Sequence, residues 1–189
     1  EGITEQMKAE NQMLWVAKMN SIVHSAEEIV MTGRTPYQGR FEGTSIGDKE
    51  AVYRAFSLTK ADKLKDKKFA ILSGGEKQKI VIARAVAQTT PWMLLDEPIA
   101  SLDIKNQIEI MQTLSELNRQ EGVSVLMVLH DINLAGIYCD RLIMLKDGQV
   151  IAAGNTNECL CEENLKKLYD ISFFHMDTKK GQRYYYAEI

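Results

Sequence analysis

Two apolar runs that do not alternate with polar residues constrain the fold of this chain most strongly. Residues 92–95 and 123–129 consist mostly of large apolar residues, as strands do when a parallel sheet is covered on both faces. Between them, apolar residues recur at helical spacing from Ile104 to Leu117. A strand, a helix and a second strand in this order form a right-handed crossover by default. The sequence therefore predicts an α/β fold with a mostly parallel, fully buried sheet.

The rest of the second half of the chain predicts two hairpins and one helix. An Asp-Gly pair suits the two-residue turn that matches the twist of the flanking strands, and a Lys-Lys-Gly string marks the second turn. The elements we expect are strands at 142–146 and 149–152, a helix over 156–169, and strands at 171–177 and 183–188.

The first half of the chain is mainly helical in pattern. Ser25 is a suitable N-cap for a helix that ends at Met31, with Glu27 and Glu28 in its first turn, where the helix dipole favours anions. A second helix is expected to begin at Asp48, and a third covers residues 76–88. The segments between them are a loop over 32–47, with four glycines and Pro36, and a basic run over 60–68 that we interpret as solvated surface.

A short apolar run at residues 13–17 is expected to be one more strand of the sheet. We therefore predict two parts. Residues 24–88 form an inserted helical subdomain, and residues 1–23 and 89–189 form an α/β core with the C-terminal hairpin.

Composition excludes several classes of protein. The chain has 189 residues, 45% hydrophobic, with a net charge of −3, so it is globular and bulk attraction to nucleic acid or acidic lipid is not expected. No stretch approaches the roughly 20 apolar residues that span a bilayer, and no signal peptide opens the sequence.

The three cysteines, Cys139, Cys159 and Cys161, are expected to be free thiols of a reducing cytoplasm. The alternative is a metal site at Cys159-x-Cys161. It is disfavoured because no second pair or histidine follows at zinc spacing.

The string Leu72-Ser73-Gly74-Gly75-Glu76-Lys77-Gln78 is the first candidate site. Two glycines without Cβ atoms stand where the free N–H groups of a helix point outward, with the positive end of the dipole behind them. Such a helix tip binds phosphate, and the Ser73 hydroxyl adds a donor. The alternative is a helix that simply begins with a serine cap.

Asp96 and Glu97 end the first apolar run, and ligands bind at the carboxyl edge of parallel sheets. Asp96 can hold a hydrated magnesium ion, because Mg²⁺ prefers oxygen ligands and keeps several waters. Glu97 is placed to orient and deprotonate an attacking water. The alternative is that both residues only cap the strand before a turn.

His130 directly follows the second apolar run and is therefore expected at the same sheet edge as Glu97. An imidazole there can contact a terminal phosphate or hold the water. Asp103 lies just beyond the acidic pair. It can brace the site, cap the helix that starts at Ile104, or do both.

These residues resemble the ATP-binding cassette (ABC) ATPases. Residues 72–78 match the signature motif of the family, and residues 92–97 its Walker B strand with the catalytic glutamate. Ser101-Leu102-Asp103 resembles the D-loop, and His130 the switch histidine. The resemblance implies a P-loop NTPase-like fold that uses ATP and Mg²⁺. It implies catalytic roles for Glu97 and His130, a metal role for Asp96, and nucleotide contacts from Ser73, Gly74, Gly75, Gln78 and Asp103.

The resemblance also implies partners. Two subunits would pair head to tail, with the signature of one closing on ATP held by the other, and the helical subdomain would dock on membrane-embedded permease subunits. The protein would then lie peripherally on the cytoplasmic face of the membrane. The string Gly33-Arg34-Thr35-Pro36-Tyr37 resembles one found in importers of iron chelates, haem and cobalamin, which also use a solute-binding protein.

Three features depart from the family pattern. The sequence has no G-x-x-x-x-G-K-[ST] loop, so we expect a chain truncated at its N-terminus that, alone, neither binds ATP tightly nor hydrolyses it. Lys18 stands where the family has a magnesium-ligating glutamine, with Gln12 nearby, and an ammonium group cannot ligate a cation. Ile99 replaces a commoner threonine, a change expected to be harmless.

The function expected from the resemblance is an ATPase subunit that powers an importer. Two alternatives remain open. One is an ABC-type ATPase outside a transporter, although the long coiled-coil insertions of such relatives are missing from this sequence. The other is a regulatory module that does not hydrolyse ATP. The intact set of Asp96, Glu97 and His130 argues against this second alternative.

Overall fold

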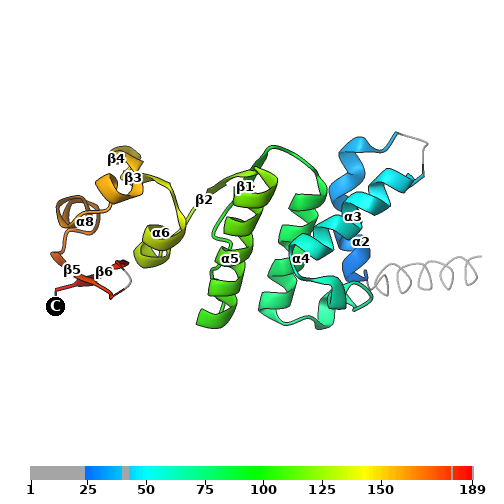
Figure 1. Cartoon of the computed structure of the whole chain (residues 1–189), viewed down its shortest axis with the longest axis horizontal. Helices are drawn as coiled ribbons and strands as arrows, with labels where there is room; N and C mark the ends of the chain where they lie inside the picture. The colour runs from blue at the N-terminus through cyan, green and yellow to red at the C-terminus, as the bar shows by residue number, and fades with distance from the viewer. Residues whose placement is uncertain (1–23, 40–42, 180, 189) are drawn as a thin grey trace, which may run out of the picture. The chain divides into compact units, whose positions relative to one another are not determined.

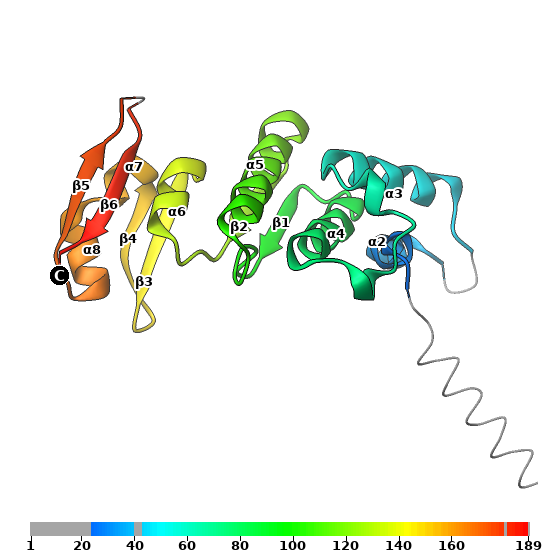
Figure 2. The same cartoon turned by 90° about the horizontal axis from the view of Figure 1, so that it is seen from below.

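The computed structural model describes residues 24–39, 43–179 and 181–188. The chain divides into two compact units, of which one ends at Pro91 and the other begins at Trp92. The expected strand at residues 13–17, together with Gln12 and Lys18, lies outside the described residues. Figures 1 and 2 show the elements of each unit in two views.

The first unit is helical. Its described elements are α2 (Ala26–Met31), the 3₁₀ helix η1 (Thr32–Tyr37), α3 (Ile46–Leu58), two short 3₁₀ turns η2 (Asp62–Leu64) and η3 (Phe69–Ile71), and α4 (Gly74–Ala87). Helix α4 contacts both α2 and α3 (Figure 2). The buried side chains that these helices share include Val30, Val52, Phe56, Ile80 and Ala83.

The α-helices described in this unit, α2, α3 and α4, all begin with a capping box. A serine N-cap accepts a hydrogen bond from the N–H group three residues later, and the acidic side chain at that position accepts one from the N–H of the serine. The serines are Ser25, Ser45 and Ser73. The predicted N-cap at Ser25 is confirmed. The other two helices begin two residues earlier than expected, since Asp48 and Glu76 are the third helical residues and not the first.

The loop expected over residues 32–47 is only partly correct. Thr32–Tyr37 forms the 3₁₀ helix η1. The hydroxyl groups of Thr32 and Thr35 donate to the backbone carbonyls of Ile29 and Thr32, respectively, and these local bonds favour continued tight turns after α2.

The second unit opens with the predicted strand–helix–strand arrangement. Strands β1 (Trp92–Leu95) and β2 (Ser124–Met127) pair in parallel, with Trp92 beside Ser124 and Leu95 beside Met127. Helix α5 (Ile104–Glu121) connects them and contacts β2.

The expectation of fully buried strands is wrong for the residues that the structure describes. Met93 is buried, but Trp92, Leu94 and Leu126 are exposed. Successive side chains of a strand point to opposite faces, and the described part of this sheet has two strands. One face is therefore covered and the other is open.

The remainder of the unit contains both predicted hairpins. Strands β3 (Arg141–Lys146) and β4 (Gln149–Asn155) are antiparallel, as are β5 (Phe173–Asp177) and β6 (Arg183–Ala187). Asp147 and Gly148 both have positive φ, 52° and 75°, as a type I′ turn requires. Helix α6 (Ile132–Tyr138) precedes the first hairpin.

The single helix expected over residues 156–169 is wrong, because the structure has two helices there. These are α7 (Thr156–Cys159) and α8 (Glu162–Tyr169). Cys161 is extended, and the amide of Asn164 donates to the carbonyl of Cys159 at 2.8 Å. The break places Leu160 in a buried cluster with Met144, Leu165 and Tyr185.

Other expectations concern metals, thiols and membranes. All three cysteines are free, and burial raises the pKa of the Cys139 thiol. Among the described residues, no three His, Cys, Asp or Glu side chains gather as a metal site. Of the helices described, none combines the length and the apolar composition that crossing a bilayer needs.

Candidate functional site

The carboxyl ends of β1 and β2 bring two candidate residues into contact. Nε2 of His130 lies 2.7 Å from Oε1 of Glu97. The N–H of Val128 donates to the carbonyl of Leu95 at 3.0 Å, so the two chains remain side by side beyond the paired strands. The prediction that Glu97 and His130 share one sheet edge is confirmed. Both side chains remain open to solvent, at 45% and 76% exposure.

An ionised carboxylate can only accept hydrogen bonds. When Glu97 is charged, the Nε2–H of His130 is therefore the donor. The pair joins a group that can accept a proton to a group that can donate one, on a surface that a ligand can reach. Asp96 directly precedes Glu97 in the chain and so lies at the same edge.

The turn after β1 holds Glu97 in an unusual backbone conformation. Glu97 and Ser101 have φ values of 44° and 60°, in the left-handed region that non-glycine residues rarely adopt. Pro98 and Ile99 are buried, and the N–H of Ala100 donates to the carbonyl of Glu97 at 3.1 Å. Strain of this kind persists only where the surroundings impose it, and it is common at functional sites.

A cavity of about 130 Å³ adjoins the pair. Such a space is suited to ordered water beside the carboxylate and imidazole and is too small for a nucleotide. Its lining residues include Glu97, Ile99, Gln107, Leu129 and His130.

Asp103 has the capping role that its position allowed. Its carboxylate accepts from the N–H of Asn106 at 2.8 Å and from the side-chain amide of the same residue at 2.7 Å. These two bonds hold the pKa of Asp103 below its usual value. Helix α5 therefore starts at a fixed point, directly after the turn that carries Glu97.

The glycine-led tip of α4 belongs to the helical unit. Ser73 and Gly74 are exposed, whereas Gly75 is buried and Gln78 is half-buried. The Ser73 hydroxyl accepts from the N–H of Glu76 at 3.3 Å, so its own hydrogen can still be donated to a ligand. The serine cap therefore does not compete with phosphate binding.

Glu76 is turned back toward the start of its own helix. Its carboxylate accepts from the N–H of Ser73 at 2.9 Å and pairs with Lys67 at 3.1 Å. The Ser73 hydrogen bond, followed by Lys67, lowers the pKa of Glu76. The basic run over 60–68 is largely exposed, as expected, but it also supplies Lys67 as a partner for this tip.

One residue near the site, Asn133, was not predicted from the sequence. Asn133 lies in the first turn of α6 and bonds to the backbone of Tyr185, 52 positions away. A polar residue three places after His130 was the available signal, but its partner depends on how the C-terminal hairpin packs.

The chain belongs to the ABC transporter family. The family model described as ABC transporter matches residues 3–100, which is just over half of the chain. The site at the ends of β1 and β2 and the tip of α4 are the parts of the structure that carry the motifs described above.

Two curated relatives show how far the similarity extends. The ferric enterobactin transport ATP-binding protein FepC of Escherichia coli K12 is 39% identical over 153 residues, covering 81% of this chain and 56% of the relative. The cobalamin import ATP-binding protein BtuD of Halobacterium salinarum is 37% identical over 150 residues, covering 79% and 37%. The chain thus spans about half of the first relative and little more than a third of the second.

Solved structures show that the fold is that of the ABC ATPases. A metal-chelate type ABC transporter in an inward-facing conformation matches with a TM-score of 0.84 and 26% identity, over 89% of this chain and 68% of that one. A dimeric ATP-binding cassette in a post-hydrolysis state, bound to ADP and Pi, matches with a TM-score of 0.58 and 31% identity, over 71% and 57%.

Proposed function

We propose that this chain is part of the ATP-binding and ATP-hydrolysing subunit of an ABC importer. The observation that carries the proposal is the 2.7 Å contact between Glu97 and His130 at the ends of adjacent parallel strands, in a chain of the ABC transporter family. A base and an imidazole in contact at this edge suit the hydrolysis of a phosphoanhydride.

In the proposed reaction, water attacks the terminal phosphorus of ATP and the bond to the bridging oxygen of ADP breaks. Glu97 accepts the proton of the water, and His130 holds the water or the terminal phosphate. Asp96 fits a hydrated Mg²⁺, since a carboxylate beside open solvent leaves room for metal-bound waters. The metal, when bound, neutralises phosphate charge.

The tip of α4 is proposed to bind the phosphate of a nucleotide held by a second subunit, as in a head-to-tail dimer. Ser73 offers a hydroxyl donor, exposed Gly74 offers a backbone N–H without a side chain in the way, and Gln78 offers an amide. Gly75 is buried, and its proposed part is to add no side chain at the tip. Asp103, at the start of α5, is proposed to line the same interface. The match to a dimeric cassette bound to ADP and Pi supports this arrangement.

The proposed partners are that second ATPase subunit, transmembrane permease subunits and, indirectly, a solute-binding protein, with no nucleic acid. The proposed location is the cytoplasmic face of the membrane. Residues 24–88 are proposed as the helical subdomain, and residues 1–23 with 89–189 as the core. The transported molecule is proposed to be an iron chelate, haem, cobalamin or a similar compound, because the names of the relatives include ferric enterobactin and cobalamin transport.

The test uses the full-length protein with Glu97→Gln. We expect kcat for ATP to fall by about 100-fold or more, with ATP affinity within twofold of wild type and an ATP-dependent dimer that persists in size-exclusion chromatography with light scattering. Glu158→Gln, at an exposed position of α7, is the matched control and should behave as wild type. Hydrolysis within threefold of wild type in Glu97→Gln would show that another group takes the proton. A wild-type protein that binds but does not hydrolyse ATP would favour the regulatory alternative.

A further inference from the structure

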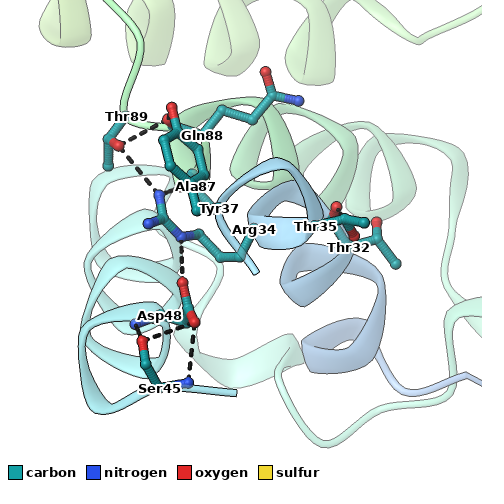
Figure 3. Close-up of polar contacts among 9 residues, drawn as sticks. All are labelled: Thr32, Arg34, Thr35, Tyr37, Ser45, Asp48, Ala87, Gln88 and Thr89. Atoms are coloured by element: carbon teal, nitrogen blue, oxygen red, sulfur yellow. Dashed lines mark hydrogen bonds and ion pairs between the residues drawn. The ribbon is translucent and has the colours of Figure 1, made fainter. Parts of the chain in front are cut away.

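The string at residues 33–37 has a structural role at the far end of α4 (Figure 3). Gly33 is buried, and a Cβ atom added to it would lie 2.3 Å from the backbone oxygen of Arg84. The backbone of η1 therefore rests directly on the last turn of α4. Any other residue at position 33 would force the two apart.

Arg34 bonds to the end of α4 from this position. Its Nη1 donates to the carbonyl of Ala87 at 2.9 Å and to the hydroxyl of Thr89 at 3.1 Å. Only 12% of its side chain is exposed. The last carbonyls of a helix have no partner within the helix and carry the negative end of its dipole, so a largely buried guanidinium is a suitable cap there.

Tyr37 binds the backbone carbonyl of the next residue, Gln88. Its hydroxyl donates to the carbonyl of Gln88 at 2.6 Å, and its ring centre lies 4.0 Å from Cζ of Arg34. Two side chains of η1 therefore cap two successive carbonyls at the end of α4. The ring also restricts the guanidinium to one plane.

The backbone conformation of Thr89 shows that the chain is strained at this end of α4. Its φ is 53°, at a position after a helix where glycine is the usual residue. A branched residue in the left-handed region is strained by about 1–3 kcal/mol. Its hydroxyl accepts from Arg34 and donates to the carbonyl of Gln88 at 2.7 Å, so the strained residue is part of the same network.

Asp48 extends the network to α3. Its carboxylate accepts from Nε of Arg34 at 2.9 Å and from the N–H and hydroxyl of Ser45 at 3.0 and 2.8 Å. The side chain of Asp48 is 6% exposed. One guanidinium thus connects the first turn of α3 with the last turn of α4. We call Arg34, Tyr37, Asp48 and Thr89 the Arg34 cluster.

We propose that Arg34 is a positioning residue for the phosphate-binding tip of α4, acting through the helix and not by contact with nucleotide. This inference rests on the proposed function. Helix α4 runs unbroken for 14 residues from Gly74 to Ala87, which is roughly 20 Å. Releasing its C-terminal end would let the axis tilt by a few degrees and move Ser73 and the two glycines by on the order of 1 Å. A misplacement of that size can cost about 100-fold in rate.

The test is Arg34→Lys in the full-length protein, because lysine keeps the charge but cannot bond to Asp48, Ala87 and Thr89 at once. The matched control is Arg54→Lys, the same change on α3 outside the cluster. All measurements are made at a temperature where circular dichroism shows every variant fully folded. A loss of folding stability alone then does not change the measured dimerisation, activity or NMR shifts.

For Arg34→Lys we expect the protein concentration needed for ATP-driven dimerisation to rise at least tenfold and kcat to fall at least tenfold. ATP affinity of the monomer should stay within twofold, because the tip contacts the nucleotide of the other subunit. The amide NMR shifts of Gly74 and Gly75 should also change, while Arg54→Lys resembles wild type in every measurement. Unchanged dimerisation by fully folded Arg34→Lys would overturn the inference.

Failure of the proposed function gives a different result. In that case the wild-type protein itself neither dimerises with ATP nor hydrolyses it. The amide NMR shifts of Gly74 and Gly75 then test the role of Arg34 without any activity measurement. Shifts that change in Arg34→Lys but not in Arg54→Lys support the positioning role. Identical shifts in wild type and both variants refute it.

Discussion

Asn133 binds both backbone polar groups of Tyr185. Its side-chain oxygen accepts from the N–H of Tyr185 at 2.8 Å, and its side-chain nitrogen donates to the carbonyl of the same residue at 3.2 Å. The amide thus pairs with β6 much as a neighbouring strand would. Tyr185 is itself buried, and its hydroxyl donates to the carbonyl of Leu160.

This relationship connects the C-terminal hairpin with the candidate site. Asp131 caps α6 by accepting from the N–H groups of Asn133 and Leu134 at 2.8 and 2.9 Å, and His130 directly precedes that cap. The helix that begins after His130 is therefore held by β6.

Asn133→Ala should weaken this connection. Two hydrogen bonds are lost and the backbone groups of Tyr185 lose their partner, so we expect the free energy of unfolding to fall by about 1–3 kcal/mol, measured by urea denaturation. In the full-length protein kcat should fall while KM stays within twofold, because His130 loses its support. Asn157→Ala, at an exposed position of α7, is the control. Equal effects of the two substitutions would contradict a role for the pairing with Tyr185.

His130→Ala should lower the rate of ATP hydrolysis and leave ATP binding nearly unchanged. The imidazole is the partner of Glu97, so in the full-length protein we expect kcat to fall at least 100-fold while ATP affinity changes less than threefold. A coupled phosphate-release assay and calorimetry give the two values. His24→Ala removes another exposed imidazole, which bonds to Glu28, and should leave both values unchanged. A His130→Ala protein with near wild-type kcat would remove this residue from the mechanism.

Gly33→Ala should destabilise the helical unit. The new Cβ atom would lie 2.3 Å from a backbone oxygen of α4, so one of the two segments must move, at a cost of about 1–3 kcal/mol. Gly43→Ala is the matched control, because nothing lies within 4 Å of the Cβ position there. Thermal melting of both variants is the measurement. Equal melting temperatures would mean that η1 does not rest on α4 as closely as described.

The lowered pKa of Asp48 predicts the direction in which the stability of the protein changes with pH. The hydrogen bond from Arg34, followed by those from Ser45, holds the pKa of Asp48 below its ordinary value of 3.8. The stability it contributes is therefore fully present above about pH 4, the unfolded-state pKa, and is lost as pH falls through the lower folded-state pKa.

Asp48→Asn tests this dependence. The urea midpoint of the variant should lie clearly below that of wild type at pH 6, and the gap should narrow as the pH is lowered below 4. Asp62→Asn, at an exposed position of η2, should show a small difference at both values. A gap for Asp48→Asn that is as wide at pH 3 as at pH 6 would exclude the charged carboxylate as its source.

Much of the local structure could be predicted from the sequence. The cap at Ser25 and the Asp147-Gly148 turn follow from patterns a few residues long. The crossover from β1 to β2 follows from two apolar runs and the helical periodicity between them. The errors have physical causes. The break at Leu160 and Cys161 interrupts a helical pattern because Leu160 enters a buried cluster. The exposure of Leu94 depends on what covers the sheet and not on the residue itself.

The candidate site could be predicted only in part. Strand order brings His130 to Glu97, and that could be inferred from where two apolar runs end. The sequence did not allow us to predict the Arg34 cluster or the pairing of Asn133 with Tyr185. Their partners depend on how helices and hairpins pack, and no short pattern encodes that.

The sequence by itself determined most of the helices and strands and the Asp147-Gly148 turn, and it predicted which residues would carry phosphate chemistry. Caps, periodicity and turn residues act between near neighbours, so they can be recognised in the chain alone. Only the tertiary structure decided which distant side chains meet: Glu97 with His130 across 33 positions, Arg34 with Ala87 across 53, and Asn133 with Tyr185 across 52. The contacts of Arg34 and Asn133 form because packed elements would otherwise leave partly buried polar groups without a partner. Glu97 and His130 remain exposed, and they meet because two paired strands end side by side.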